Sequence, residues 1–212
     1  LQTQLGYTAT WAGLVAAPSG AVAVILTPMA ARVMTKVDAR IMATLAFIAF
    51  AVSYFMRADY TQDASFWNFV MPMLVQGAAM STFFVSMITI SLDGIPPERI
   101  PAASGISNFT RITAGGFAAS IATTLWDRRE ALHQSRLADS ATAYSPLLQQ
   151  AMDHLRHLGF SDVQAYGVLA RNLVQQSYLL ASTDLFWISG WLSIVLIGAI
   201  WAARRAHSGG TI

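Results

Sequence analysis

The stretch AASGISNFTRITAGGFAASIATTLW, residues 102–126, is as long as one membrane crossing but is not uniformly apolar. About 20 residues of helix span the hydrocarbon core of a bilayer. The stretch carries one charge, Arg111, near its middle, and inserting an arginine at that depth costs roughly 3 kcal/mol unless it faces protein or water. It also holds small residues, which let membrane helices approach closely: Gly105, Gly115, Gly116, Ala118, Ala119 and Ser120. We therefore expect a helix within a bundle that surrounds a polar path.

The composition of the whole chain agrees with a membrane location. Hydrophobic residues make up 55% of the chain and charged residues 11%, whereas about a quarter of the residues are charged in soluble domains. The chain has no cysteine, which excludes disulfide and thiolate chemistry. Its net charge of +2 gives no reason to expect a nucleic-acid partner.

Further apolar stretches of membrane-helix length lie on both sides of residues 102–126. They are residues 12–33, 39–56, 66–92 and 185–203. We expect an all-α integral membrane protein with five spans and three parts: spans 1–4 in residues 1–126, an external helical loop in 127–183, and the last span with its tail in 184–212. Because the chain begins at Leu1 inside a loop, we expect it to be the C-terminal part of a longer protein.

Short loops predict the orientation, because Lys and Arg concentrate on the cytoplasmic side. The basic residues are Arg32, Lys36 and Arg40 after the first span, Arg99 after the third, and Arg204 and Arg205 in the tail. These loops and the C-terminus are therefore expected to be cytoplasmic. Tryptophans favour membrane interfaces, and those at the opposite ends of the spans are Trp11, Trp67, Trp126 and Trp187.

The polar insert has the signals of two helices. Ser145-Pro146 is a typical helix start, and Gly159 ends the apolar spacing that follows. Ser161 is the expected N-cap of a second helix, which is predicted to run into the last span. These helices form either a cap over the outer mouth or a docking surface for another protein.

Polar residues inside the spans are the candidate pathway. Ser104, Asn108 and Arg111 share one helical stripe, and Gln76 lies in the third span. The alternative is a structural arginine bonded to helix-end carbonyls or to Asp93. No Asp or Glu lies deep within any of the five spans, so a proton-coupling carboxylate is expected outside this chain.

We find no catalytic or metal-binding constellation in the sequence. His154 and His157 share a helix face but lack a third nearby ligand. No nucleophile motif surrounds any serine. We expect no enzymatic activity, no cofactor and no metal.

Three segments resemble the EmrB-type multidrug exporters, the fourteen-span drug:proton antiporter branch of the major facilitator superfamily. They are LGYTATWAGLVAAPSG (5–20), LDGIPPERIPAASGISNFTRITAGGFAAS (92–120) and QQSYLLASTDLFW (175–187). The resemblance implies that the five spans are spans ten to fourteen. It implies inner-membrane export of hydrophobic or cationic drugs against proton entry, and in Gram-negative relatives a periplasmic adaptor and an outer-membrane channel.

The loop PMAARVMTKVDARI (28–41) resembles the superfamily's basic loop motif in its second-half copy. Arg32, Asp38 and Arg40 keep its charges, while Ala30 and Val37 replace the usual glycines. This implies a helix-clamping cytoplasmic loop. Two alternatives remain: an exporter of a specific metabolite on the same fold, and a non-transporting five-span scaffold or accessory subunit.

Overall fold

The computed structural model describes residues 8–59, 66–140 and 145–202, and within these ranges it contains helices and no strands. The elements are α2 (Ala9–Met34), α3 (Ala39–Ala58), α4 (Phe66–Leu92), the short 3-10 helix η1 (Pro97–Arg99), α5 (Ile100–Ser140), α6 (Pro146–His157) and α7 (Asp162–Ala202). This arrangement confirms the all-α class.

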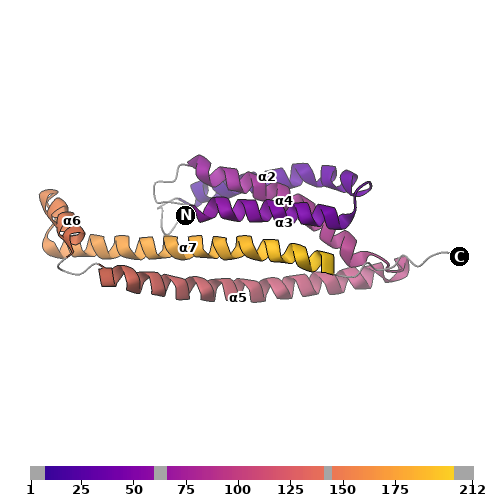
Figure 1. Cartoon of the computed structure of the whole chain (residues 1–212). Coiled ribbons are helices and arrows are strands. Elements are labelled where there is room, and N and C mark those ends of the chain that lie inside the picture. Colours follow the sequence, from indigo (N-terminus) through magenta and orange to yellow (C-terminus); the bar gives the residue numbers. More distant parts are fainter. Residues whose placement is uncertain (1–7, 60–65, 141–144, 203–212) are drawn as a thin grey trace.

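The helices form a bundle with a long hairpin along one side (Figure 1). α4 packs against both α2 and α3, α7 packs against α3, and α5 packs mainly against α7. The α2–α4 contact is close because residue 77 is glycine. A Cβ there would overlap the carbonyl oxygen of Ser19 and lie 2.9 Å from the Cβ of Val22.

In the described part of the chain, four helices are long and apolar enough to cross a membrane. They comprise Gly13–Met34, Ala39–Ala58, Trp67–Leu92 and Asp162–Ala202. α5 is not among them, because small and polar residues such as Gly115, Asn108 and Arg111 lower its mean hydropathy. The chain is thus a multi-pass membrane protein, and the crossing by residues 102–126 stays a prediction.

The first three helices lie close to where the sequence placed them, and α4 has the expected bounds of 66–92. The prediction for the end of α3 was wrong in one respect. We expected the second span to end at residue 56, which leaves Arg57 in the following loop, but α3 continues to Ala58 and Arg57 belongs to its last turn. Nothing between Phe55 and Ala58 stops the helix, because the stretch contains no Gly or Pro.

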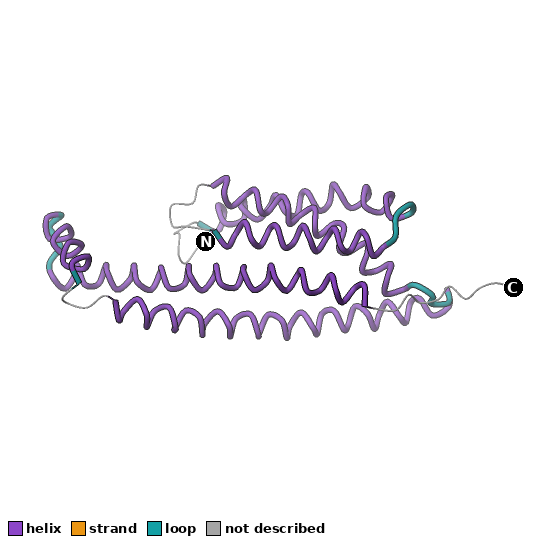
Figure 2. The backbone as a smooth tube through the Cα atoms, viewed as in Figure 1, coloured by secondary structure: helices purple, strands orange, loops and turns teal. Residues whose placement is uncertain are grey.

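The hairpin is longer than the expected spans. α5 continues past Trp126 to Ser140, and α7 starts at Asp162 rather than near residue 185. Helices of 41 residues each are roughly 60 Å long, twice the ~30 Å hydrocarbon core. Figures 1 and 2 show both helices extending beyond α2–α4, with α6 at the far tip. Both expected part boundaries, 126/127 and 183/184, fall inside helices, and the external location of 127–183 stays a prediction.

The helix signals of the tip are confirmed. Pro146 is the first residue of α6, with Ser145 before it, and Gly159 adopts a φ of 89° after the helix. Ser161 precedes α7 and forms a capping box with Gln164. The Ser161 amide donates to Gln164 Oε1 at 3.0 Å, and the Gln164 amide donates to Ser161 Oγ at 3.4 Å. As predicted, α7 runs from this cap directly into the last apolar segment.

α6 packs against α7, and each helix contributes a buried apolar residue. Met152 is 4% exposed and Ala165 is fully buried, and the two helices pack together. An ion pair closes the turn between them, because Arg156 lies 2.8 Å from Asp162 and 3.1 Å from Asp153. The hydrogen bond with Asp162, followed by the contribution of Asp153, raises the pKa of Arg156 above its usual value. The tip is therefore an ordered helical unit.

Candidate functional site

The polar stripe of α5 faces the bundle at Arg111. Arg111 Nη2 donates a hydrogen bond to Asn108 Oδ1 at 2.6 Å, within the same helix. The guanidinium carbon lies 5.5 Å from the ring centroid of Phe84 on α4, within the range of a cation–π interaction. Ser104 lies on the same face by its spacing, and all three stripe residues are exposed in this chain. The stripe thus presents the Arg111 guanidinium, which the Asn108 side-chain amide holds in place.

Gln76 does not join this stripe. Its Oε1 accepts a hydrogen bond from Arg57 Nη2, which ties α4 to α3. Arg57 is only 6% exposed. Its guanidinium also contacts Met73 Sδ at 3.4 Å and lies 5.9 Å and 5.7 Å from the ring centroids of Tyr54 and Phe186. Since Phe186 belongs to α7, one buried cation connects three helices.

Sequence reasoning missed Arg57 because it placed the residue in a loop. A usable signal was present: Ala43, Ala46, Ser53 and Arg57 recur at helical spacing, and all four are buried in α3. Ser53 strengthens the same contact, because its Oγ donates to the carbonyl oxygen of Pro72 on α4 at 2.8 Å. The α3–α4 interface therefore contains two polar contacts, one at Ser53 and one at Arg57.

The loop residues Asp38 and Arg40 lie at the other end of α3. Asp38 is the N-cap, and its Oδ1 accepts a hydrogen bond from the Arg40 amide at 2.9 Å. This cap satisfies one of the free amides of the first turn. Arg32, the third residue of the expected clamp, is exposed in the last turn of α2. The cap fixes the direction in which α3 leaves the loop.

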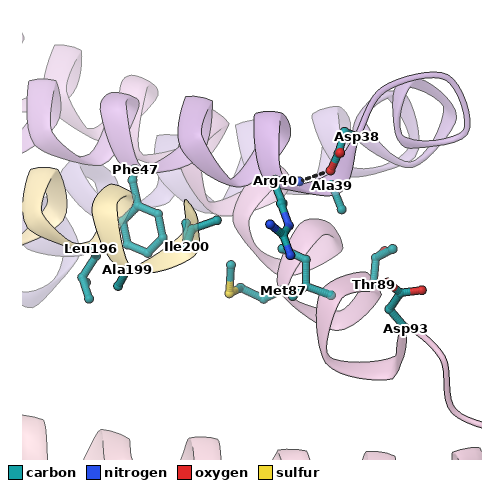
Figure 3. Close-up of a pocket in the computed structure, with 11 residues that line it drawn as sticks. Asp38, Ala39, Arg40, Phe47, Met87, Thr89, Asp93, Leu196, Ala199 and Ile200 are labelled. Atoms are coloured by element: carbon teal, nitrogen blue, oxygen red, sulfur yellow. Dashed lines mark hydrogen bonds between the residues drawn. The ribbon is translucent and has the colours of Figure 1, made fainter. Parts of the chain in front are cut away.

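Asp38 and Arg40 also line a pocket of about 520 Å³ between the ends of α3, α4 and α7. Figure 3 shows the Arg40 side chain reaching toward Met87, with Asp93 at the end of α4 and Ile200 on α7. The loop after α2, the turn after α4 and the end of α7 thus meet at one end of the bundle, as the orientation argument requires. Which side of the membrane this end faces stays a prediction.

Polar contacts join the two long helices just beyond the apolar segments. The Trp126 indole Nε1 donates to Ser182 Oγ at 3.1 Å. Two residues farther along α7, Asp184 lies 2.8 Å from His133 Nε2 and 3.4 Å from Arg129 Nη1. These contacts hold α5 and α7 side by side as the antiparallel arms of the hairpin.

Groups that bind metal ions do not gather in the described residues. No cluster of three or more His, Cys, Asp or Glu side chains is present there. His154 and His157 are exposed on α6. The polar chemistry of the described chain is therefore that of arginines, amides and paired carboxylates.

Comparison with known proteins gives several related sequences. No family model and no solved structure matches the chain. It is 40% identical over 211 residues to the fatty acid resistance protein FarB of Neisseria gonorrhoeae, and 39% identical over 211 residues to the multidrug export protein EmrB of Escherichia coli K12. It is also 23% identical over 146 residues to an uncharacterized MFS-type transporter, YhcA, of Bacillus subtilis.

The alignments with the first two relatives cover 99% of this chain and 42% and 41% of the relatives. The alignment with the Bacillus protein covers 69% of this chain and 27% of that protein. The chain therefore spans about two-fifths of the length of the curated relatives that it matches along its whole sequence.

Proposed function

We propose, from the homology of this chain to the EmrB-type multidrug export proteins, that it forms the C-terminal part of a major facilitator transporter that exports drugs. The homology confirms the resemblance identified in the segments 5–20, 92–120 and 175–187. The observation that carries the proposal is identity of 39–40% over 99% of the chain to proteins named for drug export and fatty acid resistance. In this proposal the transporter lies in the inner membrane with a cytoplasmic C-terminus, and it carries out no enzymatic step.

In this proposal, efflux of hydrophobic or cationic drugs is coupled to proton entry. Arg111 supplies a fixed positive charge beside the pathway, and Asn108 holds its guanidinium at 2.6 Å. A planar guanidinium held in this way sets the local field while keeping donors free for other groups. The stretches 12–33, 39–56, 66–92, 102–126 and 185–203 contain no Asp or Glu. In this proposal, the group that carries the proton therefore belongs to another part of the transporter.

In this proposal, the loop around Asp38 clamps the adjoining ends of α2 and α3. Its cap on α3 fixes the direction in which α3 leaves the loop, and Arg40 lines the pocket that Asp93 also lines. Rocking of the two halves of the transporter would open and close this end of the bundle. Arg32 remains part of the clamp by the resemblance alone.

A second candidate substrate class is long-chain carboxylates. It is favoured by one observation: a relative at 40% identity is named a fatty acid resistance protein. Arg111 would then attract the carboxylate instead of setting the field for a cation. The two candidates predict opposite effects of substrate charge on export.

The projecting tip suits contact with a periplasmic adaptor protein, itself joined to an outer-membrane channel. Met152 holds α6 in place, so it is not available to a partner. Apolar residues at the surface of the tip include Leu158, Val163 and Tyr166, which are 62%, 83% and 57% exposed. Changing Val163 and Tyr166 to serine should reduce drug resistance without loss of membrane insertion, whereas Met152→Ser should unfold the tip.

The deciding experiment is resistance profiling of cells in which the complete gene is deleted and then restored. Restoration with the wild-type gene should raise resistance to hydrophobic drugs, to fatty acids, or to both. In proteoliposomes with an imposed pH gradient, the complete protein should export those compounds. The chain of residues 1–212 alone should not, because it lacks the opposing half of the cavity. Unchanged resistance after deletion, together with no flux by the complete protein, would exclude the proposal and favour a non-transporting membrane protein.

A further inference from the structure

The end of the bundle opposite the loop around Asp38 holds a pocket whose lining is aromatic and acidic. Phe55 and Asp59 of the α3 end and Trp187 and Trp191 of α7 line an open pocket of about 340 Å³. Aromatic faces attract cations through their quadrupoles, and several faces around one space are the usual binding site of quaternary ammonium groups. A carboxylate at the rim adds a charge of the opposite sign.

The three rings are fixed relative to one another. Phe55 makes edge contacts with Trp187 at 5.2 Å and with Trp191 at 5.8 Å between ring centroids, and the two tryptophans stack at 6.3 Å. Gly190 makes room for this cluster, because a Cβ at that position would lie 2.8 Å from the Phe55 ring. The site is therefore built by close packing of α3 on α7.

The charges around the pocket favour a cation. Asp59 is the C-cap of α3, where the helix dipole leaves a partial negative charge. Arg57 is close in sequence, but it bonds Gln76 and lies over the rings of Tyr54 and Phe186, which do not line the pocket. Since Trp187 and Trp191 remain 49% and 53% exposed, the pocket is accessible in this chain.

We propose that Phe55, Trp187, Trp191 and Asp59 form a binding site for an organic cation with a quaternary or aryl-substituted centre. Such a cation can come from a soluble compound or from a choline-type lipid headgroup, because both present the same charged group. The inference concerns equilibrium binding and goes beyond export, so it stands or falls independently of transport.

The test is equilibrium dialysis of tetraphenylphosphonium against the complete protein in phosphatidylglycerol nanodiscs. Uncharged triphenylphosphine oxide is the matched ligand. We expect the cation to bind saturably, and we expect that the uncharged oxide does not displace it. Asp59→Asn should lower the affinity for the cation roughly five- to tenfold. The double change Trp187→Leu with Trp191→Leu should lower that affinity by about tenfold or more. Trp67→Leu, which removes a 63% exposed tryptophan from outside the pocket, and Asp139→Asn should leave binding unchanged.

Circular dichroism and thermal melting of each variant exclude loss of fold as the cause of weaker binding. Equal binding of the oxide, or unchanged binding by both pocket variants, would overturn the proposal. A repeat in phosphatidylcholine nanodiscs separates the two sources of ligand. Competition by that lipid supports the proposal with a headgroup as the occupant, and unchanged affinity supports it with a soluble cation.

Discussion

Replacing Gln76 with leucine is expected to destabilise the bundle by roughly 2 kcal/mol. Arg57 is 6% exposed, and its guanidinium donates to Gln76 Oε1. A hydrogen bond to a charged group contributes about 1.5–3 kcal/mol, and leucine removes this acceptor while leaving the cation buried. Met73 and the rings of Tyr54 and Phe186 still contact the guanidinium. The loss therefore stays below the ~3–5 kcal/mol that follows from breaking a buried ion pair.

The assay is a double-mutant cycle in detergent micelles. Unfolding by increasing dodecyl sulfate is followed by circular dichroism for the wild type, Gln76→Leu, Arg57→Leu and the double variant. We expect a coupling free energy of about 1–2 kcal/mol, since the two changes remove the same contact. Ser81→Ala is the control on the same helix, because the Ser81 hydroxyl bonds only to the Ala78 carbonyl among the contacts observed. If the effects of the two single changes are strictly additive, the Arg57–Gln76 contact does not stabilise the bundle. Gln76 would then keep the pathway role predicted from the sequence.

Three further predictions follow from other parts of the chain. In the complete protein, Arg111→Ala should abolish export at normal membrane levels and Arg111→Lys should retain part of it; normal transport by Arg111→Ala would show that this arginine is incidental. Gly77→Ala should lower the free energy of unfolding by about 1–3 kcal/mol through overpacking, as measured by the same detergent titration, whereas Gly20→Ala should not, because nothing lies within 4 Å of its added Cβ. A cysteine at Gln150 should react with a membrane-impermeant thiol reagent added from the periplasmic side, and reaction only after the inner membrane is opened would invert the topology.

The local signals in the sequence were enough to locate most helices. Prolines and the polar run at 93–101 end α4 and begin α5, and Ser161 caps the start of α7, as expected. These features depend on a few neighbouring residues, so a single sequence carries them. The stripe of Ser104, Asn108 and Arg111 is likewise a matter of spacing within one helix, and the Asn108–Arg111 bond agrees with it.

The contacts between helices could not be read in this way. Gln76 was grouped with Arg111 because both are polar and intramembrane, whereas its partner is Arg57, 19 residues away on another helix. The pocket of Phe55, Asp59, Trp187 and Trp191 joins residues more than 120 positions apart in the chain. Such pairs depend on which helix faces pack together, and helical periodicity gives a buried face without naming its neighbour.

The paired helices α5 and α7 act as a lever. Each is continuous over 41 residues, and Trp126, His133 and Asp184 fasten them to each other near mid-length. A tilt of ~5° about a pivot at the far end of a ~60 Å rod displaces its tip by roughly 5 Å. A small change of angle within the bundle would thus give a larger displacement at α6. A partner bound to α6 would oppose that change of angle through the same long arm.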